Sequence, residues 1–209
     1  MAKKPHQSSV SDTGSFYQKC KKKVNPRETF AYMPFYCEEN VWQLSQHPEF
    51  QGKAGWAVFI SNPARKCPMW HVHQEERSGH PVIWDYHVVL LTQSPSWQFW
   101  DFDTRLGFPV SPQSYLNYSF KGKILKELMP RFKLVEISFF RNNFSSDRSH
   151  MLGLQGEWVR EPPLWPPIAN GKPSNLLQFS DMDNPYGGEV YSLEALQLFL
   201  GITTHESTS

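Results

Sequence analysis

The sequence predicts a single α+β domain, because one clear helix signal stands among several segments that have the apolar patterns of strands. The helix signal begins near Cys37, runs to about Gln46 and ends before Pro48. The strongest strand signal covers residues 81–93. A chain of 209 residues is long enough for one well-buried core and short for two.

Four further segments complete the predicted domain. Residues 55–61 are a continuous apolar run closed by Asn62-Pro63, which indicates a buried strand. Residues 96–104 are predicted to form a hairpin with 81–93 across Ser94-Pro95-Ser96. Alternation at 132–139 predicts a half-exposed strand, and the spacing of apolar residues at 191–200 predicts a C-terminal helix.

The two ends of the chain are polar and set the expected boundaries. Residues 1–28, which include Lys21-Lys22-Lys23, are predicted to be a flexible tail, and residues 203–209 a frayed end. The domain therefore covers residues 29–202. Within it, the proline-rich stretch 161–167 cannot form regular helix or central strand. It is either a rigid coil laid against the surface by Trp165 or a polyproline ligand for a partner domain.

Composition excludes several classes of function. Eight Trp and fifteen Phe predict an aromatic core, and a net charge of +1 gives no argument for a nucleic-acid partner. Residues 1–6 lack the apolar segment of a secretory signal, and no apolar stretch approaches the ~20 residues of a membrane span, so we expect neither secretion nor membrane insertion. Three cysteines are too few for a disulfide framework, so we expect a reducing compartment, which is the cytoplasm with access to the nucleus.

The order of three chemical groups indicates an enzyme. Cys37 lies at a predicted helix start, His87 lies in the strongest predicted strand, and Asp101 and Asp103 lie in the next one. Thiol acyl-transfer enzymes use cysteine, histidine and an acid in this way. Helix amides and a His87 imidazolium favour the Cys37 thiolate, whereas the charges of Glu38 and Glu39 in the first turn partly oppose it.

The residue pattern alone does not choose between the two acids. In an unbroken strand, His87 shares a face with four other side chains: Ile83, Asp85, Val89 and Leu91. Asp101 and Asp103 share a face of their own strand. A three-residue hairpin loop sets Asp103 opposite His87, and a five-residue loop sets Asp101 there.

The other cysteines are predicted to be bystanders. Cys20 lies in the lysine-rich tail. Cys67 precedes His71, His73 and His80, but this spacing fits none of the usual structural zinc sites. We therefore expect no metal.

Five stretches of this chain closely resemble the protein N-terminal glutamine amidohydrolase family, over about residues 32–200. They are Tyr36-Cys37-Glu38-Glu39-Asn40, residues 57–62, residues 81–91 with the family's Trp84-Asp85-Tyr86 motif, Asp101-Phe102-Asp103-Thr104, and residues 144–151. The resemblance implies a transglutaminase-like, papain-related α+β fold, with an antiparallel sheet packed against the helix that bears the nucleophile. It also implies a triad of Cys37, His87 and Asp101, a monomer, and no cofactor.

The activity implied by the resemblance is conversion of N-terminal glutamine in proteins or peptides to glutamate, with release of ammonia, as a step in N-terminal degradation signalling. The alternatives are a cysteine peptidase or transglutaminase that uses the same triad, and a non-enzymatic interaction module built on residues 161–167. Asp85, Glu38 and Glu39 are candidates for binding the substrate α-ammonium group, and the sequence does not separate them.

Overall fold

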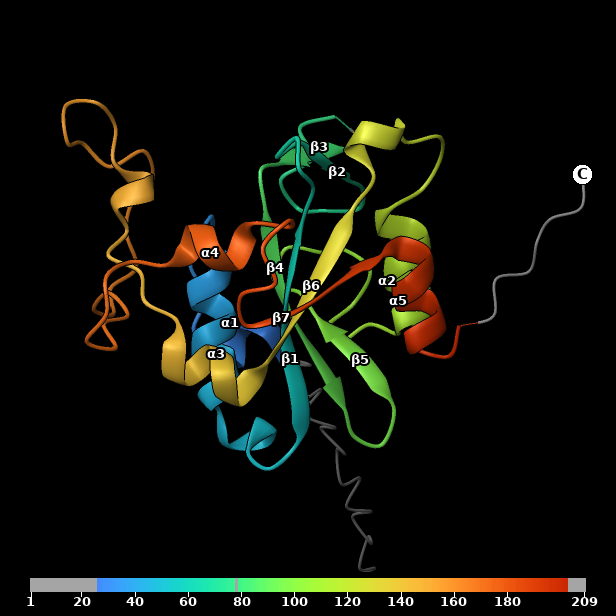
Figure 1. The fold of residues 1–209 in the computed structure, drawn as a ribbon, viewed down its shortest axis with the longest axis horizontal. Coiled ribbons are helices and arrows are strands. Elements are labelled where there is room, and N and C mark those ends of the chain that lie inside the picture. The colour runs from blue at the N-terminus through green and yellow to red at the C-terminus, as the bar shows by residue number, and fades with distance from the viewer. Residues whose placement is uncertain (1–25, 78, 203–209) are drawn as a thin grey trace, which may run out of the picture.

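The computed structural model describes residues 26–77 and 79–202, so the predictions for Cys20, Lys21-Lys22-Lys23 and residues 203–209 lie outside it. The described chain forms an antiparallel sheet in the order β5-β4-β1-β6-β7 (Figure 1). Its strands are β1 Ala54–Ser61, β4 His87–Gln93, β5 Trp97–Trp100, β6 Arg131–Glu136 and β7 Gly188–Ser192. A second sheet pairs β2 Cys67–Met69 with β3 Val82–Trp84.

Helices cover both faces of the large sheet. In Figure 1, α1, α3 and α4 lie on one side of it and α2 and α5 on the other, so the molecule has three layers. The α-helices are α1 Cys37–Gln46, α2 Pro112–Ser119, α3 Ile137–Asn143, α4 Leu176–Ser180 and α5 Leu193–Phe199. The short 3₁₀ helices are η1 Pro26–Thr29, η2 Pro48–Phe50, η3 Lys126–Leu128 and η4 Ser149–Met151. None of these helices is long and apolar enough to cross a bilayer.

Burial on both faces explains why the central strands are continuous apolar runs. Val88 and Leu90 of β4 pack in the core that contains α1, and Val89 and Leu91 pack in the core that contains α2 and α5. Alternate side chains of a strand point to opposite faces, so a strand covered on both sides needs apolar residues at every position. The helix predicted at 37–46 and the strand predicted at 55–61 match α1 and β1, β1 starting one residue earlier.

The strand predicted at 81–93 is wrong in one respect that matters for the site. The chain leaves strand geometry at Asp85 and Tyr86, because β3 pairs with β2 whereas β4 pairs with β1 and β5. Ile83 and Asp85 are exposed and do not share a buried face with His87. This break makes His87 the first residue of β4.

Two other predicted elements change type part-way along. The strand predicted at 132–139 is β6, which is buried rather than half-exposed, and it gives way to α3 at Ile137. The helix predicted at 191–200 begins at Leu193, because Tyr191 and Ser192 still pair with β6. In both cases a pairing with a distant strand decides the boundary, which periodicity along the chain does not reveal.

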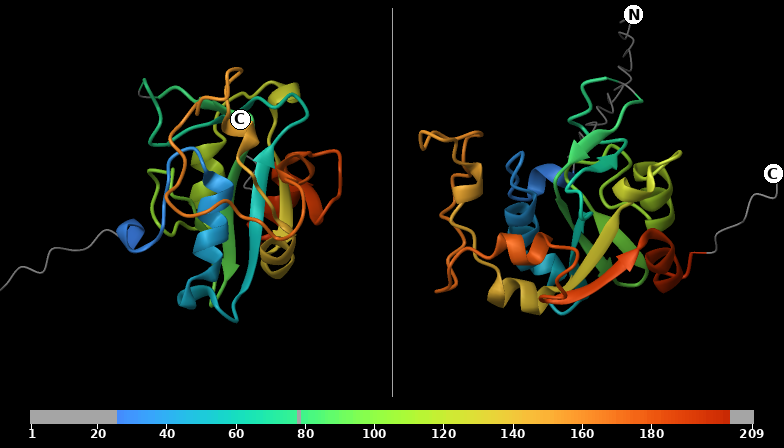
Figure 2. Two further views of the ribbon diagram at one scale, coloured as in Figure 1. Left: turned by 90° about the vertical axis from the view of Figure 1, so that its left-hand side faces the viewer. Right: turned by 45° about the horizontal axis from the view of Figure 1, so that its top comes forward.

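The proline-rich stretch has the coil conformation expected of it. Trp165 Nε1 donates to Glu39 at 2.7 Å, and the carbonyl oxygens of Pro163 and Trp165 accept from Arg148. The chain between η4 and α4 extends away from the sheet on the side of α1 (Figure 2). At the other end of the described chain, Arg27 of η1 donates to the Thr104 and Gly107 carbonyls.

Candidate active site

The start of α1 is held in place by contacts on both sides of Cys37. Asn40 clamps the incoming chain, since its side chain both donates to the Met33 carbonyl and accepts from the Met33 amide at 2.8 Å. Phe35 has a φ of 70°, a conformation that costs a non-glycine residue of order 1–3 kcal/mol. Tyr36 is buried and donates to the Arg160 carbonyl at 3.1 Å. The chain is thereby turned sharply into the helix at the cysteine.

Cys37 faces a cavity of about 280 Å³ at the N-terminal end of α1. The side chain of Tyr36, at the N-cap, does not cap the helix, so no side chain from that position takes up the first amides. The cavity is lined by Cys37 and by all three residues of the Trp84-Asp85-Tyr86 motif. The other lining residues are basic (Arg65, His150, Arg160) or apolar (Phe35, Met151, Val159, Leu176, Leu177). Cys37 is 6% exposed.

The backbone of β4 is held against the first turn of α1 on either side of His87. Tyr86 donates its hydroxyl to Glu38 at 3.1 Å, and the backbone of Val88 hydrogen-bonds to the Cys37 sulfur. These two contacts flank His87 in the chain. The start of β4, where His87 lies, therefore packs against the first turn of α1, where Cys37 lies.

The His87 ring is fully buried and oriented through one nitrogen. Its Nε2 lies 3.0 Å from Asp101 Oδ1, while its Nδ1 has no hydrogen-bond partner. The indole of Trp84 packs beside the ring, with centroids 5.0 Å apart. An imidazole held at Nε2 by a carboxylate leaves Nδ1 as the nitrogen that can exchange a proton.

Asp101 is the acid that contacts His87, and it is held by two further donors. The Tyr115 hydroxyl donates to Oδ2 at 2.8 Å, and the Asp103 amide donates to Oδ1 at 2.9 Å. The Asp103 carboxylate is turned elsewhere and accepts from Tyr32 and Gln74, each at 2.6 Å.

The hairpin register alone gives the opposite answer, and the reason lies in where β5 ends. Gln93 pairs with Trp97, so the loop has three residues, which would set Asp103 opposite His87 in a continued ladder. The ladder stops at Trp100, so the predicted strand 96–104 is too long. Beyond it, the chain pairs with residues 71–73 instead, and the turn made by the Asp103 amide brings Asp101 to His87.

Charges around the triad set its protonation. Burial opposes the charged form of His87, but the carboxylate of Asp101 outweighs it and raises the His87 pKa. Burial likewise opposes ionisation of Asp101, yet the His87 charge and hydrogen bonds hold its pKa below the usual value. The Cys37 pKa is raised well above its usual value, first by burial and then by the charges of Glu38 and Asp103.

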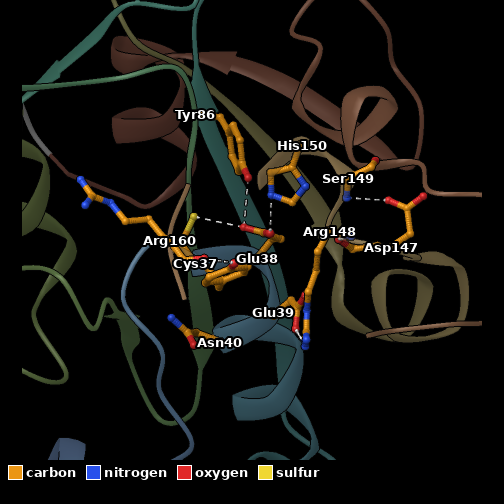
Figure 3. Close-up of polar contacts among 12 residues, drawn as sticks. Cys37, Glu38, Glu39, Asn40, Tyr86, Asp147, Arg148, Ser149, His150 and Arg160 are labelled. Carbon is orange, nitrogen blue, oxygen red and sulfur yellow. Dashed lines mark hydrogen bonds and ion pairs between the residues drawn. The ribbon is translucent and has the colours of Figure 1, made fainter. Parts of the chain in front are cut away.

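Glu38 and Glu39 are adjacent and buried but have different partners (Figure 3). Glu39 forms a two-point ion pair with Arg148, at 2.7 and 2.8 Å, and also accepts from Trp165. Glu38 Oε2 accepts from the Tyr86 hydroxyl and lies 3.6 Å from the Cys37 sulfur. Its other oxygen, Oε1, makes no hydrogen bond, and His150 Nε2 lies 3.4 Å from it.

One polar group in the cavity was not anticipated from the sequence. Trp84 Nε1 is a buried N–H donor without a hydrogen-bond partner, in a side chain that lines the cavity beside Cys37. Unpaired buried donors are costly in a folded protein. The Trp-Asp-Tyr motif was the available signal for this residue.

The remaining candidates play no part in this site. Cys67 is fully buried on β2, and burial raises its pKa to about 12, as expected of an inert thiol. Within the described residues, the ligand-type groups that come together are His87, Asp101 and Asp103. His71 and His73 lie against Lys121 and Arg27 rather than against Cys67 as co-ligands.

Comparison with known proteins gives a consistent family. A sequence model described as N-terminal glutamine amidase matches residues 32–200. Proteins named protein N-terminal glutamine amidohydrolase from Bos taurus and Homo sapiens are each 40% identical over 179 residues, covering 80% of this chain and 86% of the relative. The Danio rerio protein of the same name is 38% identical over 184 residues, covering 82% of this chain and 89% of the relative.

Proposed function

Because this chain belongs to the protein N-terminal glutamine amidohydrolase family, we propose that Cys37, His87 and Asp101 carry out its reaction through a thioester intermediate. The enzyme is an amidohydrolase that converts the side-chain carboxamide of an N-terminal glutamine to a carboxylate and releases ammonia. The observation that carries the proposal is the His87–Asp101 contact at 3.0 Å, on a strand held against the helix that begins at Cys37.

The first half-reaction replaces a carbon–nitrogen bond by a carbon–sulfur bond. The Cys37 thiol gives its proton to His87 Nδ1, and the thiolate attacks the carboxamide carbon of the substrate. The tetrahedral intermediate collapses when His87 returns that proton to the nitrogen, which leaves as ammonia. Asp101 holds the ring through Nε2 and stabilises its cationic form throughout.

The second half-reaction restores the thiol. His87, now neutral, takes a proton from water, and the hydroxide adds to the thioester carbon. Collapse breaks the carbon–sulfur bond, and the sulfur recovers its proton from His87. The product is an N-terminal glutamate.

Both half-reactions pass through an oxyanion, which needs hydrogen-bond donors in place beforehand. We assign these to the Cys37 amide, at the uncapped start of α1, and to Trp84 Nε1, the buried donor without a partner. Fixed donors of this kind stabilise charge in the transition state without reorganising.

The direct test is mass spectrometry of a short peptide that begins with glutamine, together with an ammonia assay. We expect conversion to the glutamate peptide, without chain cleavage or cross-linking, by the wild type and by Cys67→Ser. Cys37→Ala and Cys37→Ser should fold and be inactive, because neither supplies a thiolate. Turnover by Cys37→Ala would refute the thioester mechanism, and cleavage or cross-linking would point to a cysteine peptidase or a transglutaminase.

Four wider features belong to the same proposal. We infer a transglutaminase-like, papain-related fold, supported by a nucleophile at a helix start, a histidine at the start of β4 and an acid directly after β5, its neighbour in the antiparallel sheet. We also propose a monomer, as the family resemblance implies, and a location in the cytoplasm with access to the nucleus, a reducing environment that fits so few cysteines. Since the product exposes a new N-terminal acid, we place the reaction in N-terminal degradation signalling.

A further inference from the structure

Selectivity for a chain terminus requires a group that binds the α-ammonium, and two of three candidate carboxylates are ruled out by their partners. Asp85 is exposed and forms an ion pair with Arg65 at 3.2 Å, so its charge is already balanced in solvent. Glu39 is buried, but Arg148 and Trp165 occupy both of its oxygens. Neither carboxylate lacks a cation.

Glu38 is buried next to the nucleophile and is short of positive charge. Its Oε2 is used by Tyr86 and Cys37, whereas Oε1 makes no hydrogen bond and lies 3.4 Å from His150 Nε2 (Figure 3). Cys37, Tyr86 and His150 all line the cavity, so the Glu38 carboxylate lies directly behind the cavity wall at the nucleophile. A buried carboxylate without a full ionic partner is unfavourable, and a cationic ligand would relieve it.

We propose that Glu38 Oε1 binds the α-ammonium group of the substrate's first residue, in the place that His150 Nε2 now approaches. This inference rests on the proposed function, since it concerns the substrate of the same site. The Arg65 and Arg160 guanidinium groups also line the cavity. They disfavour an ammonium group near themselves and so leave Glu38 as the place where a cation is stabilised.

The dimensions of a glutamine side chain fit this assignment. Four single bonds separate the α-nitrogen from the carboxamide carbon, a span of roughly 5 Å when extended. The attacked carbon must lie about 3–3.5 Å from the sulfur, and an ammonium–carboxylate hydrogen bond takes about 2.8 Å. Glu38 Oε2 is 3.6 Å from the Cys37 sulfur and Oε1 belongs to the same carboxylate, so one glutamine residue can reach both groups at once.

Binding at Glu38 has a consequence for the thiol. After burial, the Glu38 charge is the strongest influence that keeps Cys37 protonated, with Asp103 also acting in that direction. His87 and His150 are the titratable bases nearby, and neither forms a hydrogen bond with Glu38 Oε1. A bound ammonium cancels the Glu38 charge, so thiolate formation is favoured when a chain terminus occupies the site.

The experiment compares two peptides against three proteins. The peptides are identical except that one begins with glutamine and the other with its desamino analogue, which keeps the carboxamide and lacks the α-ammonium. We expect wild type to prefer the glutamine peptide in kcat/KM by roughly 10- to 100-fold, the value of a charged hydrogen bond. Glu38→Gln should lose most of this preference. Tyr86→Phe, which removes a neighbouring hydroxyl and keeps the Glu38 charge, should retain it whatever its absolute rate.

A second measurement needs no variant. The pH dependence of Cys37 alkylation by iodoacetamide, followed by peptide mapping, gives an apparent pKa for this one thiol. A saturating glycine-initiated peptide, which supplies the ammonium and leaves the carboxamide position empty, should lower that value, and its acetylated form should not.

The outcomes separate the inference from the function on which it rests. If wild type does not deamidate the glutamine peptide, the proposed function fails. If it does, but Glu38→Gln keeps the wild-type preference between the two peptides, the Glu38 assignment alone is wrong. An apparent Cys37 pKa that is unchanged by the glycine-initiated peptide would likewise overturn it.

Discussion

Replacing Asp101 by asparagine tests the triad with little disturbance of the fold. Asp101 accepts three hydrogen bonds, from His87, from Tyr115 and from the Asp103 amide. An asparagine can keep its oxygen toward His87 and the Asp103 amide, which both approach Oδ1, and turn its NH₂ toward the Tyr115 hydroxyl. That hydroxyl can accept instead of donate. The network survives, and only the negative charge is lost.

The loss of that charge should reduce kcat by up to about 10⁴-fold, the cost of the same change in a serine protease triad. The physical reason is that Asp101 raises the His87 pKa against the effect of burial, so the imidazolium that protonates ammonia becomes harder to form. We expect ammonia release to fall accordingly, and the NMR titration of His87 to move to lower pH in Asp101→Asn.

Asp103→Asn is the matched control. Its backbone amide still donates to Asp101, and its side chain still accepts from Tyr32 or Gln74, so the loss should be about fivefold or less, the value of one neutral hydrogen bond. A severe loss in Asp103→Asn with a mild one in Asp101→Asn would show that the acid assignment is displaced by two residues.

Three further changes address the oxyanion donor, the buried ion pair and a buried lysine. Trp84→Phe keeps the ring beside His87 but removes the N–H, so kcat should fall roughly 10²–10³-fold with little change in KM, as steady-state kinetics will show. Arg148→Met leaves the Glu39 charge buried and should lower the free energy of unfolding by about 3–5 kcal/mol in urea titrations, a loss that adding Glu39→Gln partly restores. Burial lowers the pKa of Lys133 from its usual 10.5 to about 8. Between these pH values the unfolded chain binds one more proton than the folded one. The free energy of unfolding of the wild type should therefore rise with pH relative to that of Lys133→Met, by about 1.4 kcal/mol per pH unit. Parallel curves of unfolding free energy against pH for the two proteins would contradict the assignment.

Local signals in the sequence were sufficient for the elements that begin and end for local reasons. The helix at Cys37 is bounded by a turn and by Pro48, and β1 is bounded by Asn62-Pro63, so both were predicted nearly to the residue. The break at Asp85-Tyr86 was missed because it depends on the pairing of β3 with β2, which comes from earlier in the chain. An unbroken apolar pattern carries no mark of a change of partner.

The same distinction applies to the site. The order of Cys37, His87 and the two acids indicated a triad, and the family resemblance chose Asp101, which the structure places on His87. The hairpin register favours Asp103 instead, because it assumes that the ladder continues beyond Trp100, where β5 ends. Tyr115 was not found because its hydroxyl reaches Asp101 from the opposite helical layer, a contact without any sequence periodicity.

Glu38 and Glu39, which are adjacent at the start of α1, differ in whether their charge is balanced. This difference explains how the same helix terminus can carry acidic residues and a cysteine that must ionise. Acidic residues in a first turn stabilise a helix, but at this position they work against a thiolate. Arg148 removes that conflict for Glu39 by balancing its charge from 109 residues away. Glu38 has no such guanidinium and lies 3.6 Å from the sulfur, so its charge stays available to an incoming ammonium. The Glu38 charge that keeps Cys37 protonated is therefore neutralised when the α-ammonium group of a substrate binds, so the thiolate forms most readily when a free N-terminus is present.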